Sequence, residues 1–135
     1  MIIREQRITI IRHSRPTGNL NDELLWFGKS LGLFSDRDKD SSLYRLFVEL
    51  VKSSRRGELL SSDELAYRLQ LTRGTVVHHL NKLMETGIVI THRNRYALRV
   101  SNLEVLVDEL RQDLKRAMDN LKQIAKLIDD ELGFK

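Results

Sequence analysis

The sequence LTRGTVVHHLNKLMETGIV, residues 71–89, is the most informative segment of the chain. It opens with Thr72, a favoured residue at the N-cap of a helix. Apolar residues then recur at i, i+4 and i+7, the spacing of one helix face: Val76, Leu80 and Leu83. Gly87 suits the position just beyond a helix C-terminus. The segment therefore predicts a helix with one apolar face that ends before Gly87.

The opposite face of this predicted helix has small side chains near its start and hydrogen-bond donors further along. The DNA major groove admits an α-helix and presents hydrogen-bond acceptors and thymine methyl groups to it. We therefore predict that this face enters a major groove. The residues expected to contact DNA from this segment are Thr72, Arg73, Gly74, Thr75, Val77, His78, Asn81 and Lys82.

A shorter helix is predicted just before it. Ser61 and Glu64 have the spacing of a capping box, in which each side chain bonds to the backbone N–H of the other residue. The apolar face that follows consists of Leu65, Ala66 and Leu69. Two short helices joined by a tight turn at residues 70–71, the second with an exposed polar face, are typical of a helix-turn-helix.

Residues 61–99 resemble the winged helix-turn-helix of ArsR-type regulators of bacteria and archaea. The second helix of that family commonly reads Leu-Ser-x-x-Thr-Val-Ser-x-His-Leu-x-x-Leu, followed by Ala-Gly-Leu-Val. Identical or similar residues stand here at Leu71, Thr72, Thr75, Val76, His79, Leu80, Leu83, Gly87, Ile88 and Val89. The resemblance implies a winged fold and a DNA-binding transcriptional regulator. Val77 stands where the family usually has a serine that faces DNA, so no base preference is carried over.

The residues after Gly87 predict the wing. Segments 88–92 and 96–100 are rich in β-branched and apolar residues and read as two strands, with residues 93–95 as a tight connection. Arg93 and Arg95 are expected at the tip of this hairpin, where they suit phosphate or minor-groove contacts.

Composition excludes several classes of protein. The 135 residues are 41% hydrophobic and 31% charged, which is typical of a soluble globular chain. There is no cysteine, so disulfides, zinc-thiolate sites and thiol redox switches are excluded. No apolar run approaches the roughly 18 residues of a membrane span. Residues 1–11 are interrupted by Arg4, Glu5 and Arg7 and do not read as a signal peptide, so a cytoplasmic protein is expected.

The net charge of +4 is unevenly distributed along the chain. Segment 1–16 carries an excess of arginine, whereas segments 17–67 and 101–135 are slightly acidic. Segment 68–100 has one acidic residue, Glu85, and several basic ones: Arg68, Arg73, Lys82, Arg93, Arg95 and Arg99. This basic segment coincides with the helix-turn-helix and the wing, as phosphate contacts would require.

The N-terminal part predicts an arm and two helices. Residues 7–12 suit a short strand or an arm that lies on a partner. Asn21 is expected to cap an unusually apolar helix over residues 22–31, which contains Trp26 and must be covered by the winged domain or by a second subunit. After a charged linker at 36–40, the apolar stripe over residues 42–54 predicts the first core helix of the winged fold.

The C-terminal part predicts one helix over residues 103–132, about 45 Å long at 1.5 Å per residue. Its apolar stripe comprises Leu103, Leu106, Leu110, Leu114, Ala117, Leu121, Ile124, Ile128 and Leu132. The spacings average about 3.6 residues, so the stripe runs nearly straight. Because this stripe is longer than a small winged domain, we predict pairing with the same helix of a second copy, as in a coiled coil. The alternative is that it folds back within one chain.

Two chemical alternatives are weaker. Arg12, His13 and Asn19 match the phosphate pocket of histidine phosphatases, but Ser14 replaces the required glycine, and no strand–helix alternation follows. His78 and His79 are adjacent, so their imidazoles diverge on a helix and cannot chelate one metal ion. We therefore expect no enzyme, no metal and no cofactor, and no residue pattern identifies a small-molecule effector.

The sequence as a whole predicts a mainly α fold with a small β-hairpin wing. Residues 1–40 form an N-terminal arm and apolar helix, 41–100 the winged helix-turn-helix, and 101–135 a long dimerisation helix. The predicted function is a homodimeric, sequence-specific regulator of transcription that binds double-stranded DNA. The alternative is a non-enzymatic protein–protein interaction module built on a winged helix.

Overall fold

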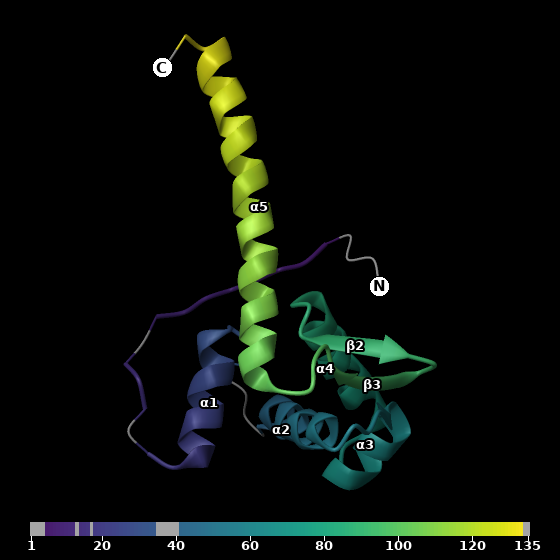
Figure 1. Ribbon diagram of the computed structural model, residues 1–135. Helices are drawn as coiled ribbons and strands as arrows, with labels where there is room; N and C mark the ends of the chain where they lie inside the picture. Colours follow the sequence, from purple (N-terminus) through teal and green to yellow (C-terminus); the bar gives the residue numbers. More distant parts are fainter. Residues whose placement is uncertain (1–4, 13, 17, 35–40, 134–135) are drawn as a thin grey trace.

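The computed structural model describes residues 5–12, 14–16, 18–34 and 41–133. Its elements, in chain order, are α1 (Leu20–Ser30), α2 (Ser42–Arg55), β1 (Leu60–Ser61), α3 (Ser62–Leu69), α4 (Arg73–Glu85), β2 (Val89–His92), β3 (Arg95–Leu98) and α5 (Leu103–Glu131). A compact group from α2 to β3 lies at the base, and α5 projects far beyond it (Figure 1). The mainly helical fold with a small sheet is confirmed.

The sheet has three strands in the order β1-β3-β2, all antiparallel. Strands β2 and β3 form the predicted hairpin, with Val89 opposite Leu98 and His92 opposite Arg95. Their turn consists of Arg93 and Asn94, both with positive φ, as a two-residue turn of type I′ requires. The sequence did not predict β1, which is two residues long and pairs with β3 across more than thirty residues of chain.

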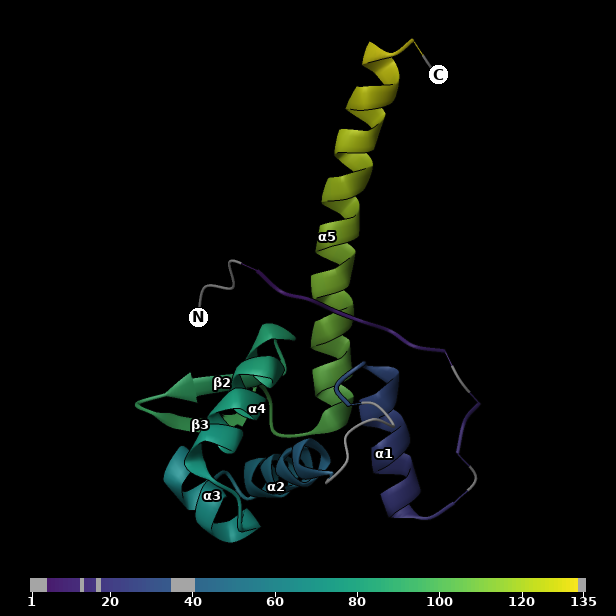
Figure 2. The ribbon, with the colours of Figure 1, turned by 180° about the vertical axis from the view of Figure 1, so that it is seen from behind.

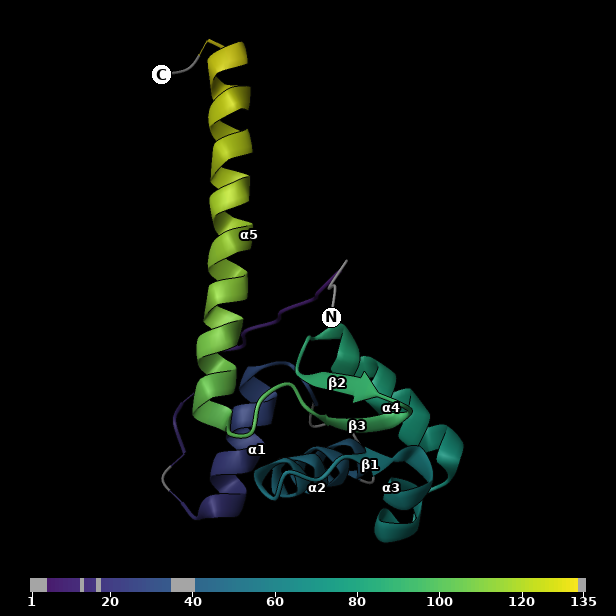
Figure 3. The same cartoon turned by 45° about the vertical axis from the view of Figure 1, so that its right-hand side comes forward.

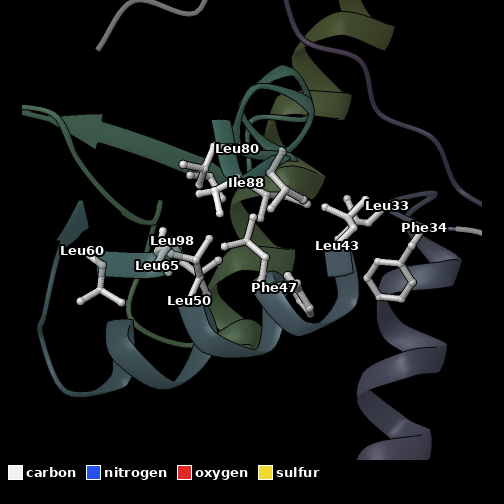
Figure 4. Close-up of a cluster of buried hydrophobic side chains, with 14 of the residues drawn as sticks. Leu33, Phe34, Leu43, Phe47, Leu50, Leu60, Leu65, Leu80, Ile88 and Leu98 are labelled. Carbon is white, nitrogen blue, oxygen red and sulfur yellow. The ribbon is translucent and has the colours of Figure 1, made fainter. Parts of the chain in front are cut away.

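The core lies between α2, α3, α4, the sheet and the first turns of α5. Leu46, Phe47 and Leu50 of α2 are fully buried in one cluster with Leu65 of α3 and Leu80 of α4. Figure 4 shows Phe47, Leu50, Leu65 and Leu80 in this cluster. Leu33 and Phe34, which follow α1, close one end of this cluster. The Phe34 ring lies where a Cβ on residue 28 would be, so Gly28 is needed for this packing.

The helix-turn-helix begins as its caps predict. The Ser61 hydroxyl accepts from the Glu64 backbone N–H at 3.0 Å, and the Glu64 carboxylate accepts from the Ser61 N–H at 3.3 Å. Gln70 adopts a left-handed conformation in the turn, and Thr72 accepts from the Thr75 N–H to cap α4. The capping box and the Thr72 cap are confirmed.

The start of α1 differs from the prediction. Asn19, and not Asn21, is the N-cap residue, because its side-chain oxygen accepts from the Asp22 backbone N–H. Asn21 lies inside the helix, and its side chain accepts a hydrogen bond from the Tyr44 hydroxyl of α2. The helix is covered on one side by the same chain, since Phe27 stacks on Phe47 with ring centroids 6.2 Å apart.

Helix α5 has the predicted length, and Figures 2 and 3 show it standing clear of the base over most of its course. Asn102 caps it by accepting from the Val105 backbone N–H at 2.8 Å. Leu106 and Leu110 are buried in the core, whereas every residue from Leu114 to Gly133 is exposed. Among the described helices, none has the length and apolar character needed to cross a membrane.

The described part of the N-terminal arm, residues 5–12, is extended but is not a strand. It passes from the end of α4 across α5 to α1 (Figure 2). The Arg7 N–H donates to the Glu85 carbonyl at 3.0 Å, and the Ile11 N–H donates to the Ser30 carbonyl at 2.7 Å. The arm therefore lies on its own chain. The charged linker predicted at residues 36–40 lies outside the described residues.

Candidate nucleic-acid interface

One face of α4 is free of the protein core. Val76, Leu80 and Leu83 are fully buried, which turns the opposite side of the helix to solvent. Residues of the predicted contact set that are exposed on α4 or its cap are Thr72, Arg73, Gly74, His78, Asn81 and Lys82. Thr75 and Val77 are half-buried at its margins. The structure therefore brings the predicted α4 set together on one surface.

The N-terminal turn of α4 is well ordered by its own side chains. The Thr72 hydroxyl donates to the Thr75 hydroxyl at 2.9 Å, so both are held at the helix start. The Arg73 guanidinium lies 3.5 Å from the Asp63 carboxylate of α3. A Cβ added to Gly74 would meet nothing within 4 Å. Packing within the chain does not require glycine there. Because Gly74 has no side chain, another molecule can come close to the helix backbone at this turn.

The two adjacent histidines have different environments. His79 is half-buried, and its Nε2 lies 2.6 Å from the hydroxyl of the buried Ser42 of α2. This bond holds α4 on α2, so His79 packs between the two helices. His78 is exposed, with its ring 5.9 Å from that of His79. Only His78 is available to a ligand that approaches α4 from solvent.

The wing separates the two arginines that were predicted at its tip. Arg93 is in the turn and is exposed. Arg95 is the first residue of β3, and its guanidinium donates to the Glu64 carboxylate at 2.9 Å. The hydrogen bond from the Ser61 backbone lowers the pKa of the Glu64 carboxyl, and Arg95 lowers it further. Placing Arg95 at the tip was wrong, because the turn has two residues and not three.

Most basic side chains of segment 68–100 already face carboxylates of the same chain. Arg68 lies 3.1 Å from Glu49 and 3.7 Å from Glu58. Arg99 lies 2.8 Å from Glu109 and also contacts Asp113. Arg73 and Arg95 are paired as described above. Among the described residues, Lys82 and Arg93 of this segment form no ion pair, so no carboxylate of the same chain holds either side chain.

Sequence reasoning missed Tyr67 of α3. It is 81% exposed, the largest exposed fraction among the large hydrophobic residues of the described part of the chain. The first helix of a helix-turn-helix crosses the DNA backbone, so a tyrosine hydroxyl on α3 has the chemistry to bond a phosphate. The only signal in the sequence was an aromatic residue one position away from the apolar face of the predicted helix.

The C-terminal end of α4 is tied to α5 through the arm. The Gln6 side chain donates to the Thr86 carbonyl at 3.0 Å. Asp113 of α5 accepts from Arg99, which lowers the pKa of its carboxyl, and a hydrogen bond from Gln6 lowers that pKa further. Asp113 in turn raises the pKa of Arg99. These contacts hold the C-terminal end of α4 beside α5.

The residues predicted for dimerisation divide into two groups. Leu106 and Leu110 are buried in the core of their own chain, so their prediction as dimer contacts was wrong; Leu103 is half-buried against the same core. The exposed group on the same stripe is named here the distal stripe: Leu114, Ala117, Leu121, Ile124, Ile128 and Leu132. Met118 and Leu127 are exposed beside it.

The described residues give little support to a metal site or to phosphatase chemistry. No three His, Cys, Asp or Glu side chains there come together as a metal site would require. His13, the nucleophile that a phosphatase would need, lies outside the described residues.

Residues 48–91 match the family described as "Bacterial regulatory protein, arsR family". The match runs from the middle of α2 through α3 and α4 into β2. It confirms the resemblance inferred from the helix-turn-helix residues. No curated protein and no solved structure matches the chain.

Proposed function

We propose, from the match of residues 48–91 to the arsR family of bacterial regulatory proteins, a homodimeric transcriptional regulator that binds specific double-stranded DNA sequences. Helix α4 enters the major groove and reads base edges through His78 and Asn81. The turn of the wing contacts the adjacent backbone through Arg93. Tyr67 of α3 bonds a phosphate.

The observation that carries this proposal is the exposed face of α4. At Gly74 this face allows close approach to the backbone, and further along it carries hydrogen-bond donors at His78, Asn81 and Lys82. No part of the described chain covers it. A groove-binding helix needs a close approach first and hydrogen-bonding side chains second. Lys82 and Arg93, which form no ion pair within the described part of the chain, border the same face and suit phosphates.

The experiment is selection of bound duplexes from a random DNA pool, followed by affinity measurements on the selected and on random duplexes. Removing His78 or Asn81 is expected to weaken the selected site by about 1–3 kcal/mol each and to spare random DNA. Arg93→Ala is expected to weaken both and to make the salt dependence shallower by about one unit. Arg95→Ala is the matched control. It is expected to change the salt dependence of DNA affinity less than Arg93→Ala does, because Glu64 already pairs with Arg95.

A second test uses the open space at Gly74. Gly74→Ala meets no atom in the free protein and replaces a poor helix former, so stability is expected to rise by up to about 1 kcal/mol. The same methyl group stands where the major groove would approach α4, so DNA affinity is expected to fall. If Gly74→Ala and Asn81→Ala both leave DNA binding unchanged, α4 is not the reading helix.

The distal stripe supports the homodimer. A row of exposed leucine and isoleucine side chains along a helix is costly in water and is covered in most coiled coils by the same row of a second copy. Two recognition helices would then contact half-sites about 10–11 base pairs apart, or a multiple of that. Light scattering tests the assembly, and a monomer at tens of micromolar overturns it.

The pairing of most arginines with carboxylates of the same chain favours the alternative, a protein–protein interaction module. A salt series separates the two functions. DNA affinity that falls steeply as salt rises supports the regulator. No measurable duplex binding at low salt supports the interaction module.

A further inference from the structure

A cleft lies where the arm crosses α5. It has a volume of about 460 Å³ and is open to solvent. Its walls come from the arm and from one turn of α5: Glu5, Gln6, Ile8, Asp113, Leu114, Arg116 and Ala117. Leu114 and Ala117 are the first two residues of the distal stripe, so the cleft is continuous with that apolar surface.

The winged domain lies on the same side of α5 as the distal stripe. Leu106 and Leu110 point into the core, and the residues that continue their 3–4 spacing are those of the distal stripe. If two α5 helices paired in parallel along this stripe, both winged domains would project into the space between the helices. In an antiparallel pair, each domain lies beyond the end of the other helix. The steric arrangement of one chain therefore favours the antiparallel pair.

The charges along α5 favour the same orientation. Residues 111–122 carry an excess of basic side chains: Arg111, Lys115, Arg116 and Lys122 against Asp113 and Asp119. Residues 123–132 carry an excess of acidic ones: Asp129, Asp130 and Glu131 against Lys126. An antiparallel pair brings the basic segment beside the acidic one, whereas a parallel pair brings like beside like. The acidic group at a helix C-terminus is unfavourable with its own dipole, and basic neighbours offset this.

We propose, building on the homodimer proposed above, that two α5 helices pair antiparallel through the distal stripe and that the last turn of each seats in the cleft of the other copy. The stripe from Leu114 to Leu132 spans about 27 Å at 1.5 Å per residue. The arm and the winged domain block its continuation below Leu114, which sets the register. Leu132 of the second copy then lies beside Leu114 and Ile8, and Leu121 lies beside Ile124 of the second copy.

Cysteine cross-linking tests this register, and the chain has no cysteine of its own. A disulfide requires Cα atoms within about 7 Å, so only close positions react. Leu114→Cys and Leu132→Cys are made separately in the full chain, mixed and oxidised. The proposal expects a cross-linked species that contains one copy of each variant, and little product from either variant alone. Leu132→Cys that cross-links efficiently with itself indicates a parallel pair and overturns the proposal.

A second experiment tests the part played by the arm. Ile8→Asp places a charge in the cleft, far from the core, and is expected to raise the dimer dissociation constant about tenfold. Ile10→Asp is the matched control: Ile10 is 63% exposed and does not line the cleft, so the dissociation constant is expected to stay unchanged. Equal dissociation constants for the two variants overturn the seating of the helix end in the cleft.

The outcomes separate this inference from the proposed function. A monomeric parent chain contradicts both the homodimer and its register. A dimer with the wrong cross-links contradicts the register alone. DNA binding is measured independently of either result.

Discussion

The first and last parts of α5 have the same apolar repeat but opposite surroundings. Leu106, near its start, is completely buried, whereas Leu121, four turns later on the same stripe, is 64% exposed. Both residues belong to one uninterrupted helix with one repeat of spacing. The comparison shows that periodicity identifies which face of a helix is apolar but does not identify what covers that face.

Charged contacts mark the boundary between the two parts. Asp113 accepts from Arg99, which follows β3, and also contacts Arg116 of the next turn at 2.6 Å. The side chain of Asp113 is only 7% exposed. Beyond this residue the described chain offers α5 no further contact except the arm. The core part of α5 thus ends at a buried ion pair, and the projecting part begins one residue later.

The largest expected effect is on the projecting part. Leu121→Glu combined with Ile124→Glu would place unpaired charges in the proposed dimer contact, at a cost of about 3–5 kcal/mol. We expect the dimer dissociation constant to rise by two to three orders of magnitude, measured by sedimentation equilibrium. Circular dichroism of the variant should show an intact fold, because neither residue contacts the core. A dimer of unchanged affinity would show that the distal stripe is covered by something other than a second copy.

The next effect is on the core part. Leu106→Ala removes a fully buried side chain and is expected to lower the free energy of unfolding by about 2–5 kcal/mol. Urea denaturation measures this. Leu127→Ala in the projecting part is the matched control, since Leu127 is 57% exposed and lies beside the distal stripe. If both substitutions lowered the free energy of unfolding of the monomer equally, the division of α5 into a core part and a projecting part would be contradicted.

Local signals in the sequence predicted most of the helix-turn-helix. Ser61, Glu64 and Thr72 act within their own first turns, so their caps follow from short-range chemistry alone. The failures have two causes: contacts between distant segments, and competition between neighbouring residues for one cap position. Strand β1 exists because it pairs with β3, and Asn21 loses the capping position because Asn19 already bonds Asp22.

The candidate site shows the same limit. The exposed face of α4 was predicted from helical periodicity, because the buried residues fix its direction. The pairing of Arg95 with Glu64 depends on a strand that meets the start of α3 in space, thirty-one residues away. Charge counts along the sequence therefore overestimated the number of arginines available to DNA.

A smaller effect is expected at the boundary itself. Asp113→Asn removes a charged acceptor of Arg99 and is expected to cost about 1–3 kcal/mol of unfolding free energy at pH 7. Because the pKa of Asp113 is lowered in the folded chain, its contribution is present above the ordinary value of about 3.9 and is lost as the pH falls through the folded value below it. Urea denaturation at pH 7 and at pH 3 measures this. The difference between the parent chain and the variant should shrink at the lower pH, and a constant difference would assign the loss to packing.

The smallest expected effect is at the ion pair of Lys115 and Asp119 in the projecting part. Its atoms are 2.8 Å apart, as close as those of Arg99 and Glu109 at the boundary, and Asp119 raises the pKa of Lys115. The two pairs differ in exposure: the Lys115 side chain is 76% exposed, and that of Arg99 is 16% exposed. Water and salt screen the exposed pair, and holding two long side chains together costs conformational entropy. At a concentration where the chain is monomeric, Lys115→Ala is therefore expected to leave the melting temperature unchanged within error, whereas Arg99→Ala lowers it clearly. A large loss in Lys115→Ala that disappears on dilution to the monomer would mean that Lys115 contacts the acidic end of a second copy, which an antiparallel pair would place beside it.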